Sequence, residues 1–447
     1  MLVIGNIKSI NGLIVDVLTT VVDKPLINTV LYLDEFPEVM LQIIGYSDKN
    51  IARCLNLSGS SKVYKGAKIF SSEKGLSIPV GDEIIGHVFD SLGRSIDVRP
   101  DEFKNSTFVD VFTEIKPDRK YRTNNNDIVE TGIKVIDFLT PFVKGRKIGI
   151  IGGAGVGKTV LTTEIMHNIG NKKDNLTYFV GIGERMREGH ELFNTLKEEK
   201  LLESTVMYLG QMNENAALRS IVGPTAARSA RYFRDKKKKD ILFFIDNIYR
   251  HVQANNELSS MIGEMPAEGG YQPSMYSDLK KLMEQLDSND NGAITTVQSV
   301  FIPSDDLSDP AVVEISQQLD AVIVLSRAVF ESGVLPAVDL LQTNSSLITE
   351  EIVGKEHYDL VGRVKAILQK YESLKGIIAV IGESELSQRD RDDYHLAQKL
   401  IKYFTQSMFV TQDLNGAPGE YVSREDNLKA IKSLLDSGTG NESTSQQ

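Results

Sequence analysis

The sequence predicts an α/β fold with three domains: an N-terminal β-barrel, a central domain with a mainly parallel sheet, and a C-terminal α-helical domain. Three observations predict it: short runs of alternating polarity near the start, apolar strands that alternate with helical patterns in the middle, and helical apolar spacing near the end. Because the chain has 447 residues, it is too long for one ordinary hydrophobic core.

Residues 1–80 form the predicted barrel. Short runs such as 13–17 and 39–44 are interrupted by Gly, Asn and Asp. Short strands with frequent turns are typical of a small antiparallel barrel.

Residues 81–333 form the predicted central domain. Its strand candidates are 178–181, 206–209, 241–245, 294–297 and 321–325. Near-continuous apolar strands separated by helical patterns indicate a parallel sheet that is covered on both faces. Ligands bind such sheets beyond the carboxyl ends of the strands.

The glycine-rich stretch 152–159 follows the apolar run 147–151 and precedes a helical pattern at 160–166. Strand, glycine loop and helix in this order are the context of a phosphate-binding loop, whose backbone N–H groups point at phosphate oxygens. We expect Lys158 to contact the β- and γ-phosphates and the Thr159 hydroxyl to bind Mg²⁺. The expected nucleotide contacts here are Gly153, Ala154, Gly155, Val156, Gly157, Lys158, Thr159 and Val160.

Acidic residues follow two of the predicted strands. Asp246 ends the run 241–245 and is a candidate for the Mg²⁺ shell, through a water molecule, although an aspartate at a strand end is as often a turn former. Glu184 follows the strand 178–181 and can polarise a water molecule for in-line attack, while Arg185 offsets charge. The alternative is a solvated cluster of paired charges at 184–188, and spacing alone does not decide between the two.

Residues 334–436 form the predicted helical domain. Its clearest signal is a stripe of apolar residues three and four positions apart: Tyr358, Val361, Val364, Leu368 and Tyr371. Residues 437–447 are polar, and we expect a disordered tail there.

Composition argues against several classes of protein. The net charge of -11 argues against a general nucleic-acid binder, and the apolar runs are shorter than the roughly 20 residues of a membrane span. The single cysteine, Cys54, fits a reducing compartment, and the six histidines offer no metal-ligand cluster. The sequence does not start with the basic and then apolar stretches of a secretory signal peptide, so we expect a cytoplasmic protein.

From about residue 60 to residue 410 the sequence resembles the catalytic beta subunit of the rotary F-type ATP synthase family. The motifs that carry the resemblance are 152–159, 181–185, 210–214, 244–248, 270–273, 303–310, 325–327, 336–339 and 354–358. The resemblance implies a RecA-like central domain, ATP or ADP with Mg²⁺ as cofactors, and a heterohexameric ring. In that ring, catalytic subunits alternate with non-catalytic alpha-like subunits around a central shaft.

The resemblance also implies roles for single residues. Glu184 matches the family's water-activating glutamate, and Phe409 matches one aromatic wall of its base pocket. The residues that match its phosphate, Mg²⁺ and active-site positions are Lys158, Thr159, Arg185, Glu188, Asp246, Asn247 and Arg250. The finger arginine of the family comes from the neighbouring alpha-like subunit, so this chain is expected to need that partner for its full rate.

The sequence departs from the family pattern away from the phosphate chemistry. Leu335 replaces an aromatic residue that stacks on adenine, and a second aromatic position falls at Leu414 or Asn415. The lever segment 384–390 is less acidic than in the family, and 215–216 replace two prolines. The family's closing segment and last helix are absent past Leu435.

These departures resemble the divergent F-type-like ATPases of mycoplasmas, wall-less bacteria in which some such complexes serve surface or gliding machinery. The expected function is therefore Mg²⁺-dependent ATP hydrolysis coupled to mechanical work, with membrane contact only through other subunits, on the inner face. Three alternatives remain open: a beta subunit that makes ATP from a proton gradient, a non-catalytic nucleotide-binding ring subunit, and a hexameric nucleic-acid translocase with the same core.

Overall fold

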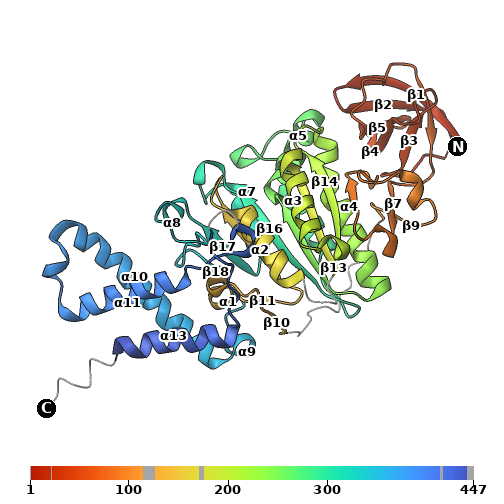
Figure 1. Ribbon diagram of the computed structural model, residues 1–447. Coiled ribbons are helices and arrows are strands. Elements are labelled where there is room, and N and C mark those ends of the chain that lie inside the picture. Colours follow the sequence, from red (N-terminus) through yellow and green to blue (C-terminus); the bar gives the residue numbers. More distant parts are fainter. Residues whose placement is uncertain (1, 22, 114–125, 171–175, 413–415, 440–447) are drawn as a thin grey trace, which may run out of the picture. The chain divides into compact units, whose positions relative to one another are not determined.

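The computed structural model describes residues 2–21, 23–113, 126–170, 176–412 and 416–439 (Figure 1). Its contacts divide the chain into two compact units. The first contains residues 1–123, 174–294 and 308–315, and the second contains residues 124–173, 295–307 and 316–447. Across the described ranges, we find no helix with the length and apolar character needed to cross a membrane.

The first unit begins with a closed antiparallel barrel of six strands in the order β1-β2-β5-β4-β3-β6, as the sequence predicted. The strands are β1 (Leu2–Asn11), β2 (Ile14–Thr19), β3 (Val30–Leu33), β4 (Met40–Asp48), β5 (Ile51–Asn56) and β6 (Lys68–Ser71). Alternate residues such as Val15 and Val17 on β2 point inward and are fully buried, as the period of two in a strand requires.

The first unit also holds four parallel strands in the order β15-β13-β14-β8. They are β8 (Val88–Asp90), β13 (Leu176–Glu184), β14 (Thr205–Gln211) and β15 (Ile241–Asp246). The accompanying elements are β7 (Ser77–Val80), β9 (Thr107–Asp110), α3 (Met186–Glu198), α4 (Ala216–Tyr232), α5 (Ile248–Ile262) and α6 (Met275–Gln285), with α7 (Pro310–Gln317) beginning in this unit. Ala217 and Ile221 of α4 pack against apolar residues of the barrel and of β7, which anchors the barrel to this helix.

The second unit is built around β12 (Lys147–Gly152), which pairs in parallel with β16 (Ile294–Phe301) on one side and β17 (Ala321–Leu325) on the other. The short strand β18 (Asn344–Ser345) pairs with β17 in the antiparallel sense. The accompanying elements are β10 (Ile128–Val129), α1 (Lys134–Leu139), β11 (Phe142–Val143), α2 (Lys158–Gly170) and α8 (Arg327–Glu331). The predicted parallel sheet is confirmed, and each strand predicted for it lies within an observed strand.

The C-terminal region is helical, as predicted, with α9 (Glu350–Val353), α10 (Lys355–Ile381), α11 (Gln388–Phe404) and α13 (Arg424–Thr439). In Figure 1, α10 and α11 lie side by side as a hairpin. Lys370 on α10 pairs with Asp390 at 2.7 Å and Asp393 at 2.5 Å on α11, which fastens the hairpin. Helix α13 continues to Thr439, so the predicted tail begins as helix, and residues 440–447 lie outside the described residues.

Single turns of other helix types connect these elements. The 3₁₀ turns are Asp82–Ile84, Pro100–Phe103, Leu202–Ser204, Glu268–Gly270, Pro303–Asp305, Glu383–Glu385 and Phe409–Thr411, and a π turn covers Phe233–Lys237. The predicted lever segment 384–390 covers the end of the connection between α10 and α11 and the first turn of α11, where the Ser387 side chain caps the helix by accepting a hydrogen bond from the Asp390 N–H.

Candidate nucleotide-binding site

The glycine loop lies in the second unit, where it joins the carboxyl end of β12 to the first residue of α2. Gly155 and Gly157 have φ angles of 74° and 92°, which glycine adopts without strain. Val156 between them is buried and anchors the loop, whereas Ala154 and Gly155 are exposed. The N–H groups in the first turn of a helix have no partner within the helix, so this position fits an anion such as a phosphate group.

The Lys158 ammonium lies over this loop. Its Nζ atom is 2.8 Å from the carbonyl oxygen of Gly152 and 2.5 Å from that of Gly153. Thr159 follows in the first turn of α2 and is exposed. Its hydroxyl is thus available at the helix N-terminus, where oxygen ligands suit Mg²⁺.

A brace formed by Asp305 and Arg327 holds the loop from the side. The Arg327 guanidinium donates to the carbonyl oxygen of Ala154 at 3.1 Å and to the Asp305 carboxylate at 3.2 Å. Ser304 and Asp305 have φ angles of 54° and 57°, which are costly for residues other than glycine. Sequence reasoning included these residues only as members of motifs and gave them no role, since nothing in a linear pattern shows that they meet the loop.

A cavity of about 480 Å³ in the second unit adjoins the loop. Its described lining residues come from three segments, namely Val156, Gly157, Val160 and Leu161; Leu325, Phe330, Gly333, Leu335, Pro336 and Ala337; and Thr405, Gln406, Ser407, Met408, Thr411 and Glu420. Because this cavity begins at the residues that also form the phosphate loop, a nucleotide bound there would place its base in the cavity. We therefore name it the base cavity.

The polar groups of the base cavity are largely engaged with the protein. The Gln406 carboxamide donates to the carbonyl oxygens of Gly132 at 2.8 Å and Glu420 at 2.6 Å, and accepts from the Lys134 N–H at 2.8 Å. The Glu420 carboxylate pairs with the Lys134 ammonium at 2.8 Å. The surface left for a ligand is therefore mainly apolar.

Phe409 is not among the described residues that line the base cavity. Its ring stacks on the His167 imidazole with centroids 5.1 Å apart and an interplanar angle of 30°. The structure thus gives Phe409 a packing partner within the protein, and its assignment as a wall of the base pocket stays a prediction.

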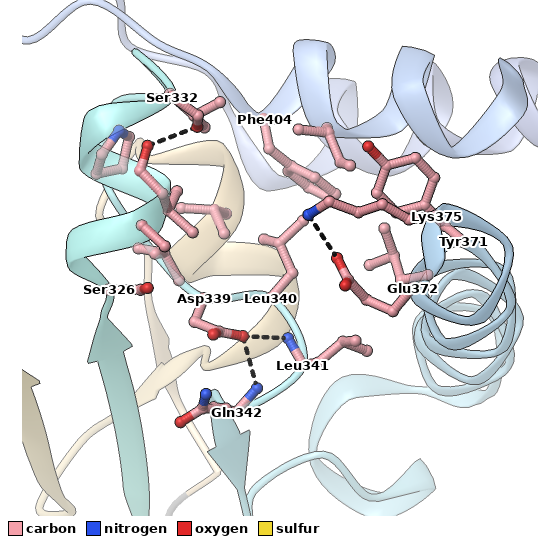
Figure 2. A pocket seen from close by; sticks show the side chains of 18 residues that line it. Ser326, Ser332, Asp339, Leu340, Leu341, Gln342, Tyr371, Glu372, Lys375 and Phe404 are labelled. Carbon is pink, nitrogen blue, oxygen red and sulfur yellow. Dashed lines mark hydrogen bonds and ion pairs between the residues drawn. The ribbon is translucent and has the colours of Figure 1, made fainter. Parts of the chain in front are cut away.

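A larger cavity of about 700 Å³ lies on α8 and is lined by residues from α10 and α11 as well (Figure 2). The Asp339 carboxylate there accepts hydrogen bonds from the N–H groups of Leu341 and Gln342, each at 3.0 Å. Glu372 faces Lys375 at 3.7 Å. None of its described lining residues belongs to the glycine loop, and it shares Pro336 with the base cavity.

The predicted acid–base residues lie in the first unit. Glu184 ends β13, where the pairing register with β14 shifts and Gly183 has a φ of 65°. Burial raises the pKa of Glu184 to about 9, with further contributions from a hydrogen bond to Glu188 and from the Asp246 and Glu188 charges. Glu184 is therefore mainly protonated at neutral pH in the absence of a bound cation.

Other predicted residues surround Glu184. Asp246 ends the adjacent strand β15 and pairs in register with Gly181 on β13. Asn247 caps α5 through its side-chain oxygen, which accepts from the Tyr249 N–H at 3.0 Å. A Cβ at Gly183 would lie 3.3 Å from the Arg250 Cβ, and the Arg185 guanidinium is 3.7 Å from the Glu188 carboxylate.

The predicted site residues thus fall into two groups. The second unit holds the loop residues and Phe409, and the first unit brings together Glu184, Arg185, Glu188, Asp246, Asn247 and Arg250. Among the residues that the structure describes, no three His, Cys, Asp or Glu side chains form a group that could hold a metal ion.

Strand, glycine loop, helix N-terminus and adjoining base cavity define a P-loop nucleotide-binding protein of the α/β class. Residues 132–345 match the nucleotide-binding domain of the ATP synthase alpha/beta family, and residues 346–418 match the C-terminal domain of V and A type ATP synthase. The chain is an alpha/beta-family subunit of a rotary ATPase or synthase. The sequence motifs had indicated the F type, whereas the helical region matches the V and A type, so the F-type beta assignment stays a prediction.

Proposed function

We propose that this chain is the catalytic subunit of an F-type-like rotary ATPase, which hydrolyses ATP with Mg²⁺ and couples the reaction to mechanical work. The observation that supports a catalytic role is the environment of the Glu184 carboxyl group. A carboxyl group at a strand end, partly buried beside acidic neighbours and with a pKa raised to about 9, has the perturbed pKa that is typical of functional sites, and its ionised form is a strong base.

Each residue has a role in the proposed reaction. Lys158 and the N–H groups of the glycine loop bind the β- and γ-phosphates, and Arg185 offsets charge on the transferring group. Glu184, in its ionised form, accepts a proton from the attacking water as the water oxygen bonds to the γ-phosphorus. The bond from that phosphorus to the β–γ bridging oxygen breaks, which yields ADP and inorganic phosphate.

Mg²⁺, when bound with the nucleotide, supplies positive charge that neutralises phosphate oxygens. Thr159 would hold it directly and Asp246 through a water molecule, since hydroxyl and carboxylate oxygens are the ligands that this ion prefers. Glu188, Asn247 and Arg250 would complete the surroundings of the reacting group.

The proposed assembly is a heterohexamer with an alpha-like partner that contributes a finger arginine, arranged around a central shaft subunit. Family membership supports this part of the proposal. The divergent base cavity and lever segment favour a role in specialised machinery such as surface motility. The match of residues 346–418 to the V and A type domain favours a second candidate, ATP synthesis coupled to an ion gradient.

The test compares ATP turnover by the native complex with turnover by a complex that carries Glu184→Gln. We expect turnover to fall about a hundredfold or more, because a general base is lost, while ATP affinity is retained. Glu191→Gln is a matched control, since Glu191 lies on the adjacent helix α3 and pairs with Arg187 at the surface. Equal turnover by the wild-type and Glu184→Gln complexes would show that the chain is a non-catalytic nucleotide-binding subunit.

A further inference from the structure

We propose that Phe330 is the residue on which the nucleotide base stacks, and this inference rests on the proposed nucleotide site. Phe330 is the fourth residue of the short helix α8, which follows β17 after the single residue Ser326. Of the residues that the structure describes around the base cavity, Phe330 alone is aromatic.

The exposure of the Phe330 ring fits a ligand-binding role. Phe330 is 43% exposed and faces a cavity whose other walls include Val160 at 37% and Leu335 at 38% exposure. Covering these apolar side chains with the flat face of a ligand removes them from water, and this favours binding. An aromatic ring adds stacking, which binds the face of any base.

Phe330 also lines the same cavity as residues of the proposed phosphate-binding loop. Val156, Gly157 and Val160 belong both to the region of the phosphate loop and to the lining of the base cavity. Phe330 lines the same cavity, three residues after the Arg327 that braces Ala154 of the loop. A nucleotide anchored by its phosphates at the loop would therefore extend its base into the cavity that Phe330 lines.

Phe409 is the rival aromatic residue, and its surroundings argue for Phe330. The Phe409 ring already stacks on His167, and a Cβ at Gly419 would overlap Phe409 atoms. One face of the Phe409 ring is therefore already covered by a ring of the protein. The Phe330 ring has no ring partner of this kind among the described aromatic contacts.

The polar groups of the base cavity add little discrimination between bases. The Gln406 carboxamide is engaged by Gly132, Glu420 and Lys134, and the Glu420 carboxylate is paired with Lys134. Recognition through a ring face tolerates different bases. We therefore expect ATP and GTP to bind with affinities within about threefold of each other.

The test measures binding of Mg²⁺ with ATP, and of Mg²⁺ with inorganic tripolyphosphate, to the native complex and to variants by calorimetry. Phe330→Leu should weaken ATP binding about tenfold and leave tripolyphosphate binding within about twofold, because only ATP carries a base. Phe330→Tyr should bind ATP as the wild type does.

Val329→Ala is the matched control, because Val329 lies on the same helix but lines the other cavity. If Phe330→Leu binds ATP as tightly as the wild type, the stacking role is refuted and the nucleotide site stands. If Phe330→Leu loses ATP and tripolyphosphate equally, Phe330 supports the loop and the stacking role is likewise refuted. If the wild-type complex binds neither ligand, the proposed function itself fails.

Discussion

The two ends of the candidate nucleotide site are built on different principles. At the phosphate end, the backbone carries the binding: Gly155 and Gly157 adopt positive φ angles, and Lys158 lies over the loop carbonyl oxygens. At the base end, apolar side chains from three separate segments form a cavity. At the phosphate end, the backbone geometry requires particular residues at particular positions. At the base end, apolar side chains from different positions can form the wall.

The largest effect is expected from Lys158→Gln, which removes the only charge on the loop itself. ATP and tripolyphosphate should both bind at least about a hundredfold more weakly, because charge-assisted contacts to phosphate are lost with either ligand. Calorimetry on the native complex would measure both affinities, with Lys281→Gln, an exposed lysine on α6, as the control. A loss confined to ATP would contradict the division into a phosphate end and a base end.

The next effect concerns the pH dependence of hydrolysis. The carboxylate form of Glu184 is the active base, and burial with acidic neighbours raises its pKa to about 9, so most of it is protonated at pH 7. The value of kcat/KM should therefore rise about tenfold from pH 7 to pH 8, bend near pH 9 and level off above it. This dependence should be the same with ATP and with GTP, because it belongs to the reaction and not to the base.

Steady-state rates from pH 6 to pH 10 would check this dependence. In Glu184→Gln the residual rate should lack the rising limb, since no carboxyl group titrates at that position. A limb that persists in the variant would assign the titration to another group.

The smallest effect is expected from Leu335→Tyr, which adds a second aromatic ring to the base cavity. ATP should bind about threefold more tightly, since ring contacts are worth about 0.5–1.5 kcal/mol, while tripolyphosphate binding should not change. In a Phe330→Leu background the same substitution should recover part of the lost affinity. Unchanged ATP affinity in both backgrounds would mean that the base does not reach this wall.

The sequence predicted much of the fold because its signals are local. The run 147–151, the loop 152–159 and the helical pattern at 160–166 describe one continuous piece of chain, and the structure has β12, the loop and α2 there. The same holds for most of the apolar stripe of α10, where Val361, Val364 and Leu368 are buried, whereas Tyr358 at its start is exposed.

Features that depend on distant residues were not predictable in this way. The brace from Arg327 to Ala154 joins positions that only the pairing of β12 with β17 brings together. The packing of Phe409 on His167 has the same origin, since one residue belongs to α2 and the other to a turn after α11. Phe330 carried no signal because a single aromatic residue in a short helix fits no motif.

Gly153 and Asp305 illustrate what such distant contacts mean for evolution. A Cβ at Gly153 would overlap the Oδ1 atom of Asp305, which the Arg327 guanidinium holds in place. Any side chain at Gly153 would therefore require the Asp305 carboxylate to move, although the two positions are far apart in the sequence. Tolerance to substitution at Gly153 is thus coupled to the side-chain position of Asp305, and we expect the residues at these two positions to vary together.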